Sequence, residues 1–136
     1  MIENLIGKHP YSLDARLICL TSRGAWTADE VRELIALLER EQQRDSRIGL
    51  LLDVGGGISI GPEARRALAE RADKRGATIP VAIIGASLPI RAVLTMVIRT
   101  VRLLGGPAAP AAFLATEVEA RRWIENYRPA GSGRLT

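Results

Sequence analysis

The sequence has very few of the residues that build most catalytic and metal-binding sites. Its 136 residues include a single histidine, a single cysteine and only 4% aromatic residues. Because Cys19 has no partner for an internal disulfide and sits inside an apolar run, we expect a reduced thiol in the core. One histidine and one cysteine cannot supply an ordinary zinc site, so we expect no metal and no cofactor. His9 lies in a predicted turn without an evident partner for acid–base chemistry, and we expect it at the surface.

The scarcity of aromatic residues and the modest charge also exclude classes of partner. Aromatic side chains are too few for a sheet that stacks RNA bases on paired rings. Lys and Arg total 19 against 15 Asp and Glu, a net charge of +4, and the two signs alternate along most of the chain. We therefore expect no nucleic acid partner. The longest stretch without an acidic residue lies between Asp73 and Glu117, where an anionic partner should be sought.

The chain shows neither an export signal nor a segment suited to a membrane. No basic region followed by an apolar stretch opens the sequence. The longest helical apolar segment, residues 88–104, carries three arginines and is a poor membrane span. We expect a cytoplasmic protein with no membrane span. It should form one domain over residues 1–128, with a disordered tail over residues 129–136.

What the sequence does contain is a set of aliphatic runs separated by helical patterns. The run Ile48–Leu52 stops at Asp53 and is followed by three consecutive glycines, Gly55–Gly57. An unbroken apolar run is typical of a strand buried on both faces in a parallel sheet. Gly61-Pro62 then begins a helical pattern. The loop between strand and helix lies where α/β folds place contacts with ligands and partners.

Strand and helix patterns alternate along the chain. Thr27 and Glu30 have the spacing of a capping box, which predicts a helix from there to about Asp45. The other predicted helices cover residues 62–76, 88–104 and 117–127, and the predicted strands cover residues 13–21, 48–53, 79–85 and 111–115. A short edge strand is expected within residues 2–11, with His9-Pro10 limiting its pairing. Residues 22–26 are expected to be a connection.

This order, β-β-α-β-α-β-α-β-α, predicts an α/β fold. Its mixed, mostly parallel sheet should have four to five strands joined by right-handed crossovers. The runs Ile48–Leu52 and Ile79–Ile84 are continuously aliphatic, so we expect them to be central parallel neighbours.

Three segments in this order give the chain a familiar pattern. They are Leu50-Leu51-Leu52-Asp53 with its glycine loop, Val81-Ala82-Ile83-Ile84-Gly85, and Phe113-Leu114-Ala115-Thr116-Glu117 with Ala120, Trp123 and Ile124. From Tyr11 to Tyr127 the chain resembles the STAS superfamily, and within it the stand-alone SpoIIAA-like proteins, the fold of bacterial anti-sigma-factor antagonists. The resemblance implies a related fold, which CRAL-TRIO lipid-binding domains share in outline, and a non-catalytic regulatory or protein-interaction role.

One position departs from that resemblance. Phosphorylatable antagonists carry a serine or threonine directly before the glycine that opens the second helix, usually after an acid. Here Ile60 precedes Gly61, and no acid precedes Ser59. The resemblance therefore implies a binding or regulatory domain without the usual phosphorylation switch.

The loop after the first buried strand offers three candidate residues, Asp53, Gly57 and Ser59. The glycines do not fit a dinucleotide fingerprint, which would need a glycine at Ile60, and no Lys-Ser/Thr pair follows as in a P-loop. A turn is favoured over a nucleotide site. Asp53 either accepts amide hydrogen bonds within the loop or contacts a ligand, with the first favoured. Ser59 either caps the next helix or is a modification site, with capping favoured.

The predicted helix over residues 88–104 has an unusual distribution of side chains. At 100° per residue, a basic stripe spans about 80° of arc and contains Arg91, Thr95, Arg99 and Arg102. The opposing core face contains Ile90, Leu94, Val97 and Val101. Met96 and Leu103 lie on a flank that neither face covers. Either a neighbouring helix or the tail covers this flank, or it is a surface for a partner or ligand.

Two functions remain open, and no residue set supports an enzyme. The first is a non-catalytic interaction domain that docks a protein partner or a second copy of itself. The alternative is a binder of an apolar or amphipathic small molecule, such as a lipid, beneath the third helix, with arginines meeting an anionic head group. A pocket lined by Leu88, Ala92, Met96 and Leu103 would favour the ligand. A flat, self-complementary patch would favour docking.

Overall fold

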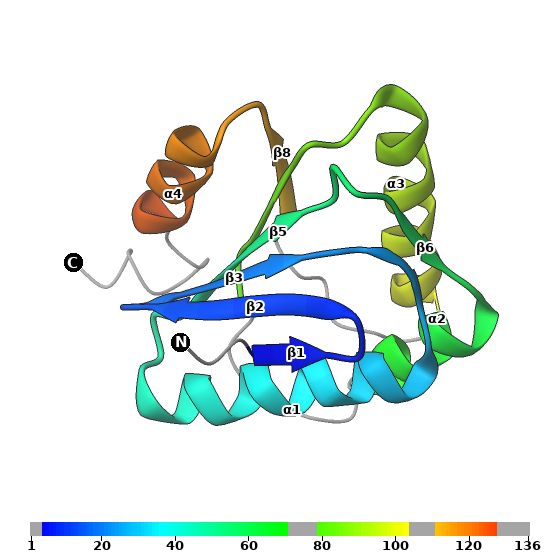
Figure 1. The fold of residues 1–136 in the computed structure, drawn as a ribbon, viewed down its shortest axis with the longest axis horizontal. Coiled ribbons are helices and arrows are strands. Elements are labelled where there is room, and N and C mark those ends of the chain that lie inside the picture. Colours follow the sequence, from blue (N-terminus) through cyan, green and yellow to red (C-terminus); the bar gives the residue numbers. More distant parts are fainter. Residues whose placement is uncertain (1–3, 71–78, 104–110, 128–136) are drawn as a thin grey trace.

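The computed structural model describes residues 4–70, 79–103 and 111–127, with residues 101–103 described as helical backbone without their side chains. Six strands form one sheet in the order β1-β2-β3-β5-β7-β8 (Figure 1). They are β1 (Asn4–Ile6), β2 (His9–Asp14), β3 (Leu17–Thr21), β5 (Gly49–Asp53), β7 (Val81–Ile84) and β8 (Ala111–Leu114). Two further strands, β4 (Gly24–Trp26) and β6 (Ile58–Ile60), form a small parallel pair. The helices are α1 (Ala28–Arg44), α2 (Pro62–Ala69), α3 (Leu88–Leu103) and α4 (Glu117–Asn126).

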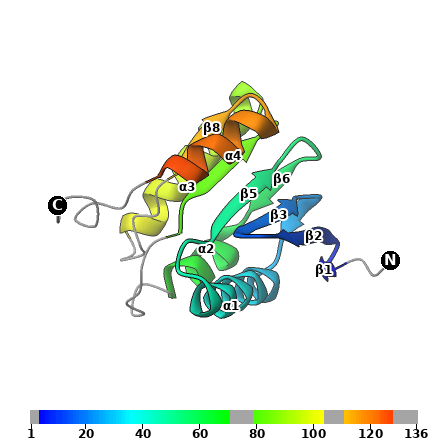
Figure 2. The same ribbon diagram turned by 90° about the vertical axis from the view of Figure 1, so that its left-hand side faces the viewer.

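Helices cover both faces of the sheet. Alternate residues of the central strands point to opposite faces, so Leu50 and Ile83 pack in the core shared with the first three helices, while Leu51 and Ala82 pack against Ala120 of α4. Figure 1 shows α1 and α4 on opposite sides of the strands, and Figure 2 shows α1 and α2 side by side. A layer of helices on each face is what buries continuously aliphatic parallel strands.

The predicted centre of the sheet is confirmed. Strand β5 pairs in parallel with β3 on one side and with β7 on the other, and Leu50 is opposite Val81. Neither β5 nor β7 is an edge strand. The capping box at the start of α1 is also confirmed, because the Glu30 amide donates to Thr27 Oγ1 at 3.1 Å and the Thr27 amide donates to Glu30 Oε1 at 3.0 Å.

The predicted strand count is wrong, because the N-terminal part folds into more strands than expected. Residues 13–21 do not form one strand: the chain turns at Ala15, with φ of 55°, and β2 and β3 form an antiparallel hairpin. Pro10 lies opposite Leu5 of β1, and the pairing of β2 with β3 begins one residue later, at Tyr11. Proline is tolerated in β2 because its missing N–H is not needed for pairing with β3. The predicted connection at residues 22–26 contains β4, whose three residues are too few to show a strand period.

The surface position predicted for His9 is also wrong. Its relative exposure is 0%, because its ring stacks on Trp26 and lies beside Glu30 of α1. The predicted end of the second helix at Gly76 and the predicted tail over residues 129–136 lie outside the described residues. Within the described part of the chain, no helix is both long enough and apolar enough to span a membrane.

Candidate functional site

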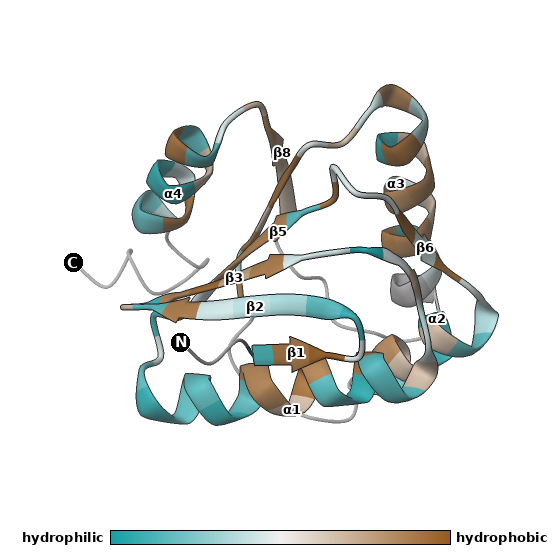
Figure 3. Ribbon diagram, viewed as in Figure 1, coloured by the Kyte–Doolittle hydropathy of each residue, from teal (hydrophilic) through white to brown (hydrophobic). Residues whose placement is uncertain are grey.

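Helix α3 buries one face and leaves another apolar face in solvent. Ser87 precedes the helix, and its oxygen Oγ accepts from the Ile90 amide at 3.4 Å. Pro89 fits in the first turn, where no intrahelical partner for its missing N–H exists. Leu94 and Val97 are 5% and 4% exposed and hold the helix to the core. In Figure 3, α3 is brown over much of its length, whereas α1 is teal at its ends with brown bands between them.

The opposite side of α3 carries large aliphatic side chains with no cover among the described residues. Leu88 is 79% exposed, Met96 is 66% exposed, and Ala92 lies exposed between them at four-residue spacing. Residues four apart lie one above the other on a helix, so the three form a stripe. The side chains of Arg102 and Leu103, which the sequence placed at this surface, lie outside the described residues.

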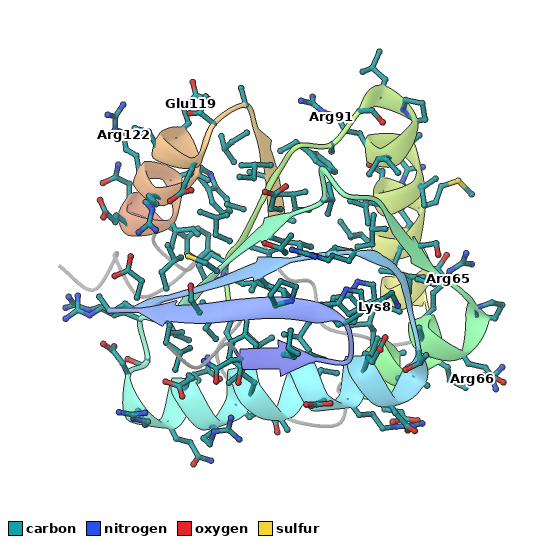
Figure 4. All side chains as sticks on the ribbon, viewed as in Figure 1. Lys8, Arg65, Arg66, Arg91, Glu119 and Arg122 are labelled. Carbon is teal, nitrogen blue, oxygen red and sulfur yellow. The ribbon has the colours of Figure 1, made fainter. Side chains whose placement is uncertain are left out.

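A polar stripe runs beside the apolar one. Arg91, Thr95 and Arg99 are exposed, again at four-residue spacing. The guanidinium of Arg91 lies 5.5 Å from the centre of the Phe113 ring and donates to the Ala86 carbonyl at 3.4 Å. Figure 4 shows Arg91 extending from the start of α3. We call Leu88, Ala92 and Met96, with Arg91, Thr95 and Arg99, the α3 surface.

The α3 surface is one-sided in charge. The helix contains no acidic residue, and among the described residues no carboxylate forms an ion pair with Arg91 or Arg99. Elsewhere the described arginines often have such partners, as Arg121 has in Asp14 and Glu117. The α3 surface therefore presents exposed apolar area beside positive charge.

The loop candidates have mainly structural contacts. Asp53 Oδ1 accepts from the Gly55 amide at 2.9 Å, and a Cβ placed on Gly85 would lie 2.9 Å from the same oxygen. Gly57 has φ of 99°, and its carbonyl accepts from the Gly24 amide at 3.0 Å. The predicted capping by Ser59 is wrong. Ser59 lies exposed in β6, two residues before the cap of α2, and α2 has no side-chain cap.

A buried polar cluster, which the sequence did not indicate, ties this loop to the N-terminal hairpin. The rings of His9 and Trp26 stack with centroids 3.9 Å apart and an interplanar angle of 3°. Trp26 Nε1 donates to Ser22 Oγ at 3.0 Å, and Ser22 Oγ donates to the Gly57 carbonyl at 2.8 Å. The His9 Nδ1 atom accepts from the Arg23 amide at 2.9 Å. Apart from the contact between Trp26 and Ser22, no local pattern signals this cluster, because His9 and Gly57 reach it from distant segments of the chain.

The electrostatics of the cluster favour a neutral imidazole beside a charged carboxylate. Burial lowers the pKa of His9, and Lys8 lowers it further, while Glu30 acts in the opposite direction. Burial raises the pKa of Glu30, but the Thr27 amide, Lys8 and His9 together outweigh this and hold that pKa below its usual range. His9 Nε2 lies 3.4 Å from Glu30 Oε1, without hydrogen-bond geometry.

Histidine, serine and glutamate meet in this cluster, but their geometry is not that of a hydrolase. A nucleophile needs its hydroxyl beside an imidazole acceptor. Here the Ser22 hydroxyl donates to the Gly57 carbonyl, and His9 Nδ1 is occupied by the Arg23 amide. Ser22 and His9 are both fully buried. The cluster therefore joins elements of the fold.

Other candidate positions lie apart from α3. A cavity of about 440 Å³ opens where α1 and α2 begin, and its lining is Thr27, Ala28, Asp29, Arg32, Glu63 and Arg66. The predicted core thiol of Cys19 is half-buried, and burial raises its pKa although Arg121 opposes the shift. Within the described part of the chain, no group of three or more His, Cys, Asp or Glu could hold a metal ion.

Comparison of the sequence and comparison of the structure give different results. No protein-family model and no curated protein matches the chain. Among solved structures, it is similar to an uncharacterised protein of the DUF3478 family with a SpoIIAA-like fold from Shewanella loihica PV-4. The TM-score is 0.57 at 19% identity, over 91% of this chain and 98% of the other. With its alternating strands and helices and mostly parallel sheet, this chain has a SpoIIAA-like fold.

Proposed function

We propose that this protein is a non-catalytic interaction domain that docks a protein partner on the α3 surface. The observation that carries the proposal is the exposure of Leu88 and Met96, 79% and 66%, on a helix without acidic residues. Burying a large aliphatic side chain stabilises by about 1.5–3 kcal/mol, so their exposure indicates a use outside the monomer core. The partner is a protein segment with apolar side chains flanked by carboxylates.

Charge complementarity selects this partner over a second copy of the chain. A twofold contact through α3 would bring Arg91 and Arg99 of two copies together without a carboxylate on either helix. Like charges facing each other at an interface oppose association. An acidic amphipathic segment of another protein meets the same arginines with opposite charge, and its apolar side chains cover Met96 and its neighbours.

The alternative, a lipid-like small molecule held beneath α3, has less support. A ligand site of that kind is a concave pocket that buries most of the ligand. Leu88, Ala92 and Met96 are exposed, and the described cavity near the starts of α1 and α2 has a polar, charged lining. Binding of a lipid-like molecule is therefore kept as one possible outcome of the binding experiments described below.

A pair of synthetic helical peptides tests the proposal. Both carry leucines at four-residue spacing, one flanked by glutamates and the other by lysines. In backbone amide NMR spectra we expect the glutamate peptide to perturb α3 and the lysine peptide to bind at least about tenfold more weakly. Arg91→Gln with Arg99→Gln should reduce the salt dependence of glutamate-peptide binding, because these side chains are the positive margin of the surface.

Substitutions on the surface give the matched controls. Leu88→Asp with Met96→Asp should keep the fold, since both side chains are exposed, and should lose peptide binding. Leu13→Asp changes an exposed leucine on β2, 45% exposed, and should leave binding unchanged. Equal affinity for the two peptides, or perturbation away from α3, contradicts the proposal. A dimer, or a retained small molecule, that the double variant loses in native mass spectrometry assigns the surface to a second copy or to the ligand instead.

We further propose that the domain works without the phosphorylation switch of SpoIIAA-like antagonists. Ile60, with no hydroxyl, occupies the position before Gly61, and the hydroxyl of Ser59 lies in β6 rather than at the helix cap. Ser59→Ala should therefore leave partner binding intact. A kinase-dependent change in binding that disappears in this variant would restore the switch.

A further inference from the structure

The side chain of His9 is connected by hydrogen bonds to a loop outside its own strand, so its protonation state can affect that loop. It is the single histidine of the chain, and its side chain is 0% exposed. Its Nδ1 atom accepts from the Arg23 amide at 2.9 Å. An imidazole nitrogen that accepts a hydrogen bond carries no proton, so the neutral ring has its proton on Nε2.

The contacts of His9 lead step by step to the glycine loop, residues 54–57. Arg23 is bonded to His9 through its amide, and the next amide, that of Gly24, donates to the Gly57 carbonyl at 3.0 Å. On the other side of Arg23, the Ser22 hydroxyl donates to the same carbonyl at 2.8 Å. The three-residue segment Ser22–Gly24 is therefore held by His9 at its centre and holds Gly57 at its two ends.

Protonation of His9 is incompatible with this arrangement. A proton on Nδ1 would face the Arg23 N–H group, so a donor would meet a donor and the hydrogen bond at that atom would be lost. The buried imidazolium would also be separated from water. Glu30 Oε1, 3.4 Å from Nε2, would attract the new charge, which draws the ring toward α1 rather than toward Arg23.

The charged groups around His9 are few. Lys8 faces it from the turn between β1 and β2, and Glu30 faces it from α1. Strands β1, β3 and β4 carry no charged residue. Burial and Lys8 act against protonation, Glu30 and the backbone of Ala25 act for it, and the pKa of His9 is lowered overall. His9 is therefore neutral at neutral pH and gains its proton only in acid.

We propose that His9 is an acid-sensitive latch: its neutral ring holds the Ser22–Gly24 segment, and with it the glycine loop at the carboxyl end of β5. This edge of the sheet is where open α/β folds place their contacts. Protonation then changes the shape of that edge while the sheet stays folded. The inference is independent of the docking proposed for α3.

Amide hydrogen exchange in tag-free protein tests the latch. The single imidazole gives one titration curve by NMR, which should show a pKa below the ordinary histidine value. As His9 gains its proton, the amides of Arg23 and Gly24 should exchange about tenfold faster than expected from pH alone, the effect of losing one hydrogen bond. The Leu51 amide in the central strand β5 should keep its protection.

Two variants keep the result interpretable. His9→Asn places an amide oxygen near the Nδ1 position, so it retains an acceptor for Arg23 but does not titrate, and the acid-induced change should vanish. Glu30→Gln keeps the capping box but removes the charge, so the transition should move to lower pH. Equal exchange of Arg23 and Gly24 in wild type and His9→Asn at every pH overturns the proposal. So does a raised pKa, or loss of all native signals together with the titration.

Discussion

At the scale of single residues, the carboxyl end of β5 depends on close approach between backbones. Asp53 Oδ1 accepts from the Gly55 amide, and Gly85, at the end of β7, lies against both. Gly85 has φ of 79°, a conformation in which a side chain is strained, and its missing Cβ leaves room for the Gly55 nitrogen. The favoured interpretation of Asp53, that it structures the loop, has its geometric basis here.

Replacing Gly85 by alanine should therefore destabilise the protein more than the same change at Gly57. A Cβ at Gly85 would lie 2.8 Å from the Gly55 nitrogen, whereas one at Gly57 meets nothing within 4 Å. Both positions have positive φ. We expect a loss of about 1–2 kcal/mol for Gly57→Ala from backbone strain alone, and of about 2–4 kcal/mol for Gly85→Ala.

Urea denaturation at neutral pH measures both changes against wild type. The Gly57 variant is the control for the shared φ effect, so the difference between the two isolates the steric contact. Equal losses of unfolding free energy at the two positions would show that Gly55 can move away from the new methyl group at little cost. The hydrogen bond between Asp53 and the Gly55 amide would then not be needed for stability.

At the scale of elements, the start of α1 could be predicted from the sequence because its capping is local. Thr27 and Glu30 are three residues apart and satisfy each other's backbone groups, which the spacing alone predicts. Thr116 and Glu119 have the same spacing at the start of α4. There the Glu119 amide donates to Thr116 Oγ1 at 3.2 Å, but the Glu119 carboxylate accepts from the Ala115 amide instead.

Removing the cap of α1 should cost about 1 kcal/mol of unfolding free energy, through Thr27→Ala, because the Glu30 amide then loses its acceptor. Thr27→Ser keeps the oxygen and should stay within about 0.5 kcal/mol of wild type. Chemical denaturation of both variants checks this. A loss as large for serine as for alanine would mean that the threonine methyl, rather than the hydroxyl, holds the helix.

The element-scale misses have a common cause in pairing between distant segments. Strands β4 and β6 have three residues each, and they exist because Gly24 meets Ile58 across the sheet edge, not because either segment has a strand pattern. The turn at Ala15 likewise divides residues 13–21, which the sequence predicts as one strand. Burial of His9 follows from the resulting hairpins, which a residue-by-residue pattern does not contain.

At the scale of the whole molecule, α4 closes the second face of the sheet by close contact. A Cβ placed on Gly49 of β5 would overlap the side chain of Ile124 on α4. The glycine thus lets the helix approach the strand, and Ala120, with 0% exposure, packs beside it. The buried core on this face is limited to Leu17, Leu51, Ala82 and Ala120, whereas the core under the other three helices contains many more buried residues.

A double-mutant cycle tests this fit. Gly49→Ala alone should destabilise by about 1–3 kcal/mol through overpacking, and Ile124→Ala alone by up to about 2 kcal/mol, since Ile124 is only partly buried. The double variant should lose less than the sum, because the shortened side chain makes room for the new methyl. Denaturation midpoints of the four proteins give the coupling, and strict additivity would show that α4 shifts freely instead.

The sequence by itself determined the features that depend on neighbours along the chain. These are the aliphatic strands at the centre of the sheet, the α1 cap, the α/β order, and a helix, α3, with arginines beside an apolar flank. Tertiary structure alone decided what distant segments do to one another. It buried His9 against Trp26 and added strands at the N-terminal edge of the sheet. It also placed Ser59 in β6 rather than at the predicted helix cap, and left Leu88 and Met96 in solvent. Spacing specifies the face of a helix on which a residue lies, whereas only packing decides whether another element covers that face.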